Sequence, residues 1–133
     1  MGLAFLLVLL GLGCLFLAYR EQEPFQEIKV KGEALQKLVV QETVSQEADP
    51  MERTIDFAAL QRINPEIVGW LYVPQIGVDS PILTGQTDTE YLTKDFEGAY
   101  SPLGSIFTFA GARLSDSQVY LFAHNMASGQ MFG

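Results

Sequence analysis

The sequence is poor in the residues that most enzymes and metal sites use for chemistry. Among 133 residues there is one cysteine, Cys14, and one histidine, His124. A single cysteine excludes a disulfide framework, and one cysteine with one histidine gives no ligand set for zinc. The glycines form no phosphate-binding pattern. The sequence therefore predicts no metal site and no cofactor.

Basic residues are also few, with 8 Lys and Arg against 16 Asp and Glu. Nucleic-acid binding needs clustered Lys and Arg that face the phosphates, so a nucleic-acid partner is disfavoured. The acidic residues Asp88, Glu90, Asp95 and Glu97 could bind a cation, but they lack the regular alternation of an EF-hand loop. A solvated acidic surface is the favoured interpretation.

Charge is absent from the first 19 residues, which are dominated by Leu, Phe, Val and Gly. At about 1.5 Å per residue, a helix of this length extends roughly 28 Å, close to the hydrocarbon thickness of a bilayer. The run lacks the basic start and short core of a cleaved signal peptide. It also stays apolar after Cys14, where a lipoprotein signal would turn polar. We expect an uncleaved transmembrane anchor over residues 1–19, with a signal peptide and a lipoprotein signal as alternatives.

Residues 20–50 have a different composition, rich in Glu, Gln, Lys and Val, with no tryptophan and a single phenylalanine. This composition indicates a stalk or linker that spaces a domain from the membrane. Within it, residues 34–40 could form a short amphipathic helix. Composition changes again at Met51, so the sequence predicts a domain over residues 51–133.

The expected domain begins with a helix. Thr54 can cap it, and its apolar residues lie at four-residue spacing in Ile55, Ala59 and Ile63. The dipeptide Asn64-Pro65 then interrupts the helix, because the residue before proline avoids the helical region. Asn64 can cap one further turn, which Gly69 ends.

The remainder has the pattern of short strands joined by turns. Strands are expected at 70–73, 78–83, 104–109 and 118–122, with a turn at Gly77 and a helical turn at 87–92. A leading helix followed by about four strands predicts the start of an all-β barrel or sandwich. These residues alone leave such a fold incomplete, with open edges and a half-covered core.

His124 is the best candidate for chemistry in this domain. It follows an apolar strand and precedes a small, polar segment, and strand ends that open onto loops are common places for catalysis. On position alone, however, a lone histidine at a strand end is more often a solvated turn residue.

Five segments, in order along the chain, carry the motifs of one family: Asn64-Pro65-Glu66-Ile67-Val68-Gly69-Trp70-Leu71; Val78-Asp79-Ser80-Pro81-Ile82-Leu83; Thr87 to Phe96 with Tyr91-Leu92 and Asp95-Phe96; Gly104-Ser105-Ile106-Phe107; and Tyr120-Leu121-Phe122-Ala123-His124-Asn125-Met126 with Met131-Phe132. They resemble, in turn, the opening, the second strand, the next helical turn, the following strand and the histidine segment of class B sortases. The matches fall between Ile55 and Phe132.

The resemblance implies a β-barrel cysteine transpeptidase on the outer face of a Gram-positive membrane, held by a single membrane-spanning segment. Such an enzyme cleaves the sorting-signal peptide of a secreted protein, holds it as a thioester and passes it to an amine of the cell wall or of a pilin. A thiolate attacks, a histidine protonates the leaving amine and an arginine stabilises the oxyanion. His124 matches the histidine and is the candidate catalytic residue.

The family's cysteine and arginine lie on later strands, and the resemblance assigns neither to a residue before Gly133. Cys14 lies in the apolar run and Arg113 in a loop, so neither is carried over. Ala123 replaces the usual glycine before the histidine, and Asp88 stands where many members have asparagine. We expect a class B sortase truncated before its Cys and Arg, and inactive as it stands. The alternative is a membrane-tethered, non-catalytic binding or assembly module.

Overall fold

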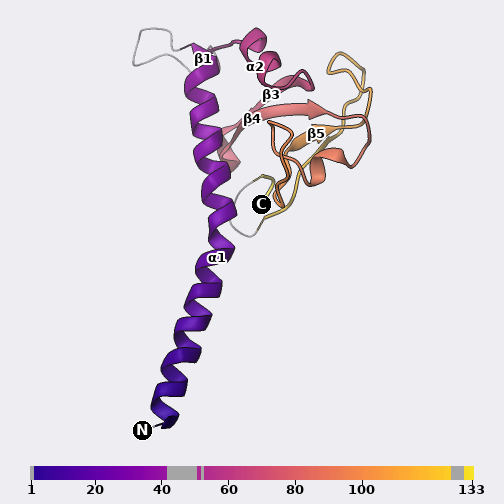
Figure 1. Ribbon diagram of the computed structural model, residues 1–133. Coiled ribbons are helices and arrows are strands. Elements are labelled where there is room, and N and C mark those ends of the chain that lie inside the picture. The colour runs from indigo at the N-terminus through magenta and orange to yellow at the C-terminus, as the bar shows by residue number, and fades with distance from the viewer. Residues whose placement is uncertain (1, 42–50, 52, 127–130) are drawn as a thin grey trace.

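The chain combines one long helix with a body of short helices and strands. The computed structural model describes the backbone of residues 2–41, 51, 53–126 and 131–133, and their side chains except at 2–8, 18–25 and 39–41. The helix α1 (Gly2–Val39) comes first. Figure 1 shows that the carboxyl-terminal half of α1 lies against the body, while its amino-terminal half extends away from it.

The helix α1 is longer than the sequence analysis expects. It joins the apolar run and most of the expected stalk into one helix, and the short helix expected at 34–40 is only its end. Among the residues that the structure describes, no helix is both long enough and apolar enough to cross a membrane. The transmembrane anchor expected over residues 1–19 is therefore not supported. Residues 42–50 of the expected stalk lie outside the described residues.

The carboxyl-terminal part of α1 belongs to the domain and is more than a spacer. Leu35 is only 4% exposed and lies in a core cluster with residues from the helices and strands that follow. Lys31 Nζ lies 3.0 Å from Asp95 Oδ2, and Gln36 Nε2 donates to the Asp79 carbonyl oxygen at 2.8 Å. Burial of an apolar side chain and polar contacts on the same helix face together fix α1 against the body.

A short helix, α2 (Phe57–Ile63), follows the first strand pair. Its N-cap is Asp56, whose carboxylate accepts a hydrogen bond of 2.9 Å from a backbone N–H in the first turn. The expected cap at Thr54 is wrong, because Thr54 lies in β2 (Thr54–Ile55). This strand pairs antiparallel with β1 (Val40–Gln41), which follows α1 directly.

Four strands form one sheet in the order β3-β4-β5-β6. β3 pairs antiparallel with β4, β4 runs parallel to β5, and β5 pairs antiparallel with β6. Among the described residues the sheet is open, with β3 and β6 at its edges, so the expected barrel is not closed. The domain has a mainly-β fold with a leading helix. The strand bounds are β3 (Ile67–Val73), β4 (Val78–Thr84), β5 (Ile106–Thr108) and β6 (Leu121–Phe122).

Two strands differ from their expected bounds for reasons of pairing. β3 begins at Ile67, and Gly69 lies inside it at a bulge instead of ending a turn. A Cβ on Gly69 would meet the tip of the exposed Leu114 side chain, which would have to turn aside. β6 has only two residues, because only Leu121 and Phe122 find partners in β5.

Each face of the sheet carries an apolar cluster. Neighbouring residues of a strand point to opposite faces, so Ile106 and Phe107 belong to different clusters. The cluster on the face covered by α2 is Leu35, Leu60, Ile67, Leu83, Tyr91 and Phe107, and the cluster on the other face is Val78, Ile82 and Ile106.

Candidate functional site

His124 lies two residues after the end of β6. Phe107 and Phe122 are paired across β5 and β6, and their rings stack with centroids 5.6 Å apart. Phe109 adds an edge-to-face contact to Phe122, with centroids 4.7 Å apart. Aromatic pairs of this kind stabilise a short strand that has few ladder hydrogen bonds. They fix β6, and β6 in turn places His124.

The imidazole of His124 is half-buried and has a defined partner. Its Nε2 lies 2.9 Å from the carbonyl oxygen of Leu92. Because a carbonyl oxygen only accepts, Nε2 must carry the hydrogen, and in the neutral ring Nδ1 is then the acceptor. The backbone of His124 is also held, since Phe132 N donates to the His124 carbonyl oxygen at 3.1 Å. The ring is thus oriented with Nδ1 as the nitrogen that can take up a proton.

Leu92 ends the 3-10 helix η3 (Glu90–Leu92), which is anchored in the core by its middle residue, Tyr91. The Tyr91 hydroxyl donates to Glu66 Oε2 at 2.5 Å and accepts from Asn64 Nδ2 at 2.8 Å. Burial, assisted by the hydrogen bond to the Glu66 carboxylate, raises the pKa of Tyr91 above its ordinary value. The Asn-Pro-Glu motif therefore fixes the element that carries the Leu92 carbonyl.

Gly104 allows a second anchor for this segment. Its φ is +60°, and a Cβ would lie 2.5 Å from the Tyr91 carbonyl oxygen, so only glycine fits. The next residue, Ser105, uses this close approach: its N–H donates to the Tyr91 carbonyl oxygen at 2.9 Å, and its hydroxyl donates to the Lys94 carbonyl oxygen at 2.9 Å.

The helix α1 also reaches the segment after η3. Lys31 pairs with Asp95 at 3.0 Å and with Glu97 at 3.3 Å. The hydrogen bond that Lys31 donates to the Asp95 carboxylate is the main cause that raises the pKa of Lys31. The sequence analysis missed this pair, although Ile28, Lys31 and Leu35 share one helix face at spacings of three and four.

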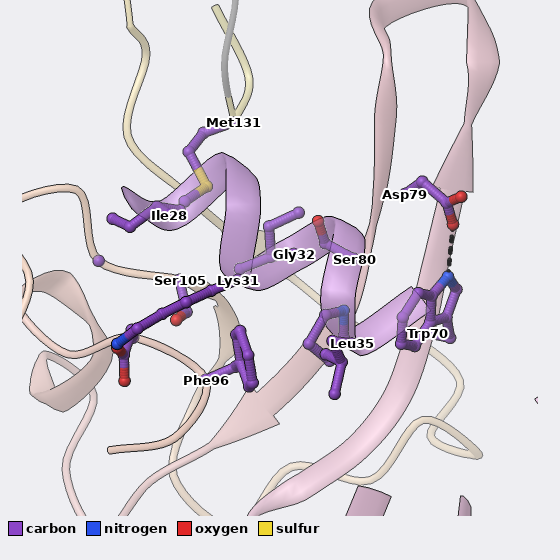
Figure 2. Close-up of a pocket in the computed structure, with 14 residues that line it drawn as sticks. Ile28, Lys31, Gly32, Leu35, Trp70, Asp79, Ser80, Phe96, Ser105 and Met131 are labelled. Atoms are coloured by element: carbon purple, nitrogen blue, oxygen red, sulfur yellow. Dashed lines mark hydrogen bonds and ion pairs between the residues drawn. The ribbon is translucent and has the colours of Figure 1, made fainter. Parts of the chain in front are cut away.

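A cavity of about 70 Å³ lies where α1 meets the sheet. Figure 2 shows Lys31 and Leu35 leaving α1 on the side of Phe96, with Trp70 bonded to Asp79 beyond them. His124 is not among the described residues that line it. The cavity is therefore a packing gap between α1 and the sheet, and it is separate from the candidate catalytic residue.

The acidic residues are less solvated than the sequence analysis expects. Asp95 is 4% exposed, Glu90 Oε1 lies 2.6 Å from Lys94 Nζ, and Asp88 accepts from Ala110 N at 2.8 Å. The interpretation as a purely solvated surface is thus wrong for Asp95. Among the residues with described positions, no group of three or more His, Cys, Asp or Glu could hold a metal ion.

Neither Cys14 nor Arg113 is brought to His124 by an observed contact. Cys14 is exposed and lies in the amino-terminal half of α1, the part that extends away from the domain in Figure 1. Arg113 is exposed in the loop before β6, where its backbone N–H donates to Asp116 Oδ2 at 2.9 Å. The described residues thus provide an oriented imidazole without an adjacent thiol.

Comparison with known proteins finds a likeness to class B sortases. No protein-family model matches the chain. Sortase B of Staphylococcus aureus is 33% identical over 78 residues, which cover 57% of this chain and 32% of that protein. Sortase B of Listeria monocytogenes is 32% identical over 75 residues, which cover 55% and 30%. The chain therefore spans about a third of the length of these curated relatives.

Solved structures show the same likeness. Sortase B of Bacillus anthracis has a TM-score of 0.67 at 28% identity, covering 83% of this chain and 52% of that one. A Streptococcus pyogenes class B sortase involved in pilus biogenesis has a TM-score of 0.53 at 35% identity, covering 58% and 43%. Residues 51–133 make up less than two thirds of the chain, so the first likeness extends into α1. The chain is a relative of the class B sortases, and the likeness covers part of their length.

Proposed function

We propose that the chain supplies the acid–base part of a class B sortase active site, with His124 as the histidine. The observation that supports this is the position of His124 two residues after the end of β6, with Nε2 bonded to the Leu92 carbonyl oxygen at 2.9 Å. This geometry keeps Nδ1 as the exchanging atom. It can take a proton from a thiol and give it to a departing amine.

In the proposed reaction, a cysteine thiolate attacks a peptide carbonyl in a sorting signal and an arginine stabilises the oxyanion. The C–N bond breaks as the imidazolium gives its proton to the leaving amine, and a thioester remains. A cell-wall or pilin amine then attacks the thioester and releases the thiol. Cys14 and Arg113 are not proposed for these roles, so we expect the 133-residue chain alone to be inactive.

The proposed location is the cell membrane, with a single membrane-spanning segment in the amino-terminal half of α1 and the domain outside the cytoplasm. Support comes from large apolar side chains on that half that are 52–69% exposed: Leu9, Leu10, Leu12, Leu15, Phe16 and Leu17. A contiguous apolar surface of this kind marks an interaction site in a folded protein. Recovery of the chain in the soluble fraction of lysed cells, with no material in the membrane pellet, would contradict the proposal.

A chimaera tests the catalytic role. The part of the chain that matches Bacillus anthracis sortase B, 83% of its residues, replaces the corresponding part of that protein, whose remaining residues supply the cysteine and arginine. We expect cleavage of a sorting-signal peptide and its transfer to an amine, with His124→Gln reducing the rate by about 10²–10⁴, the usual contribution of an acid–base group. A folded chimaera that keeps its rate with His124→Gln would refute the role. Turnover by the 133-residue chain alone would refute its proposed inactivity.

The second candidate is a membrane-tethered binding or assembly module without catalysis. It is favoured by the core formed by these residues alone, in which Leu60, Ile67 and Leu83 are fully buried. Cooperative unfolding of the 133-residue chain, together with an inactive chimaera, would favour this second candidate. A molten or aggregating chain would favour the first.

A further inference from the structure

The buried carboxylate of Asp95 joins α1 to the segment whose Leu92 carbonyl oxygen bonds to His124. Asp95 Oδ1 accepts hydrogen bonds from the backbone N–H groups of Glu97 and Ala99, at 3.0 and 2.9 Å. Its Oδ2 is bonded to Lys31 Nζ at 3.0 Å. The side chain of Asp95 is 5% exposed, whereas that of Glu97, the second partner of Lys31, is 47% exposed. Lys31 therefore supplies the charge that Asp95 needs in order to stay buried.

Asp95 lies three residues after Leu92, and the chain between them is cross-linked to the loop that follows. Ser101 N donates to the Thr93 carbonyl oxygen at 2.9 Å, and the Ser105 hydroxyl donates to the Lys94 carbonyl oxygen at 2.9 Å. We expect a shift of Asp95 toward solvent to be passed through this short segment to the Leu92 carbonyl, which is the partner of the His124 ring.

We infer that Lys31 is a positioning residue for His124, acting through Asp95 and the Leu92 carbonyl oxygen. When the ammonium is present, Asp95 is docked against α1 and the Leu92 carbonyl accepts from Nε2. When it is removed, the unpaired carboxylate turns toward water, because a buried and unpaired charge is costly. The carbonyl then leaves Nε2 and the ring loses its fixed orientation. The relevance of this device to catalysis rests on the proposed function of His124.

The composition of the chain makes the inference directly measurable. His124 is the only histidine and Trp70 the only tryptophan, so their side-chain NMR signals need no assignment by mutation. The spectrum is recorded in alkaline solution, where the two neutral forms of an imidazole are compared. The long-range ¹H–¹⁵N spectrum then gives the ratio of the Nε2–H to the Nδ1–H form. The indole N–H of Trp70, bonded to Asp79 Oδ1 at 2.7 Å, reports the fold independently.

The experiment compares Lys31→Met with Lys31→Arg and with Lys37→Met, an exposed lysine of the same helix. In Lys31→Met we expect the ratio of Nε2–H to Nδ1–H to fall about fivefold, which is the factor for one hydrogen bond of about 1 kcal/mol net. Lys31→Arg should restore the ratio to within about twofold, because guanidinium pairs with carboxylates. Lys37→Met should leave it unchanged, and the Trp70 signal should keep its position in all three.

Two outcomes overturn the inference. One is an unchanged ratio in Lys31→Met. The other is a fall in the ratio together with a displaced Trp70 indole signal, which would show that the whole fold has loosened. If Lys31→Met does not fold, Lys31→Gln takes its place, since it also removes the ammonium and leaves the Asp95 carboxylate unpaired. An unchanged ratio in Lys31→Gln would likewise overturn the inference. Because the ratio is read without turnover, its result is separate from that of the chimaera assay.

Discussion

Truncation of Leu35 tests the integration of α1 into the domain. Leu35→Ala removes three carbons from a side chain that is 4% exposed, and at about 0.8 kcal/mol per buried carbon the transfer part is about 2.4 kcal/mol. Leu35 already lines the cavity of about 70 Å³, so the neighbouring atoms are loosely packed and the added cavity cost is modest. We expect a loss of about 3 kcal/mol in the free energy of unfolding, within the usual range for this substitution.

The matched control is Leu38→Ala, one turn further along the same helix, where the side chain is 67% exposed. Since alanine and leucine both favour helix, this change should cost less than about 0.5 kcal/mol. Urea unfolding followed by Trp70 fluorescence gives both values. At about 4 °C per kcal/mol, the Leu35→Ala chain should also melt about 12 °C lower. Equal effects of the two substitutions would refute the placement of α1 in the core.

Three further predictions concern the contact between α1 and the domain, and the buried polar groups. Gly32→Ala should stabilise the chain by about 1 kcal/mol, since Ala favours helix and its Cβ meets nothing within 4 Å; a lower melting temperature would contradict this. Asp79→Ala should cost about 2–3 kcal/mol in urea unfolding, because it leaves Arg53 and the Trp70 indole N–H without their acceptor, and Asp79→Asn should cost less. Because the folded state raises the pKa of Tyr91, its contribution should be fully present below about pH 10, the ordinary tyrosine pKa, and be lost at higher pH; Tyr91→Phe should flatten this alkaline fall in melting temperature.

The strands could be predicted because their signals are local. Ile67 to Val73 and Val78 to Thr84 contain aromatic and β-branched runs bounded by turn residues. The catalytic role of His124 stays a prediction, which rests on motifs in a fixed order. The errors at strand ends arise from pairing. Residues 118–120 have strand-like composition, yet a strand forms only where β5 provides partners.

The extent of α1 could not be predicted, because local signals oppose it. Pro24 and Gly32 both disfavour a helix interior, and the polar composition after Arg20 is typical of a linker. The contacts that stabilise the helix are distant in sequence: Lys31 bonds to a residue 64 positions later, and Gln36 to one 43 positions later. The bond between His124 and the Leu92 carbonyl oxygen could not be predicted either. The two residues are far apart in sequence, and a backbone atom has no residue type that would indicate its role.

The separation between Lys31 and Asp95 also governs the order of events during synthesis. The helix is synthesised before any of the strands that cover it. At about 5–20 residues per second, the 64 residues up to Asp95 take about 3–13 s. During the earlier part of that interval Leu35 stays uncovered, until its core partners Leu60, Ile67 and Leu83 have followed. The nascent protein therefore presents an amphipathic helix to chaperones or to a lipid surface for seconds before its own strands can bury it.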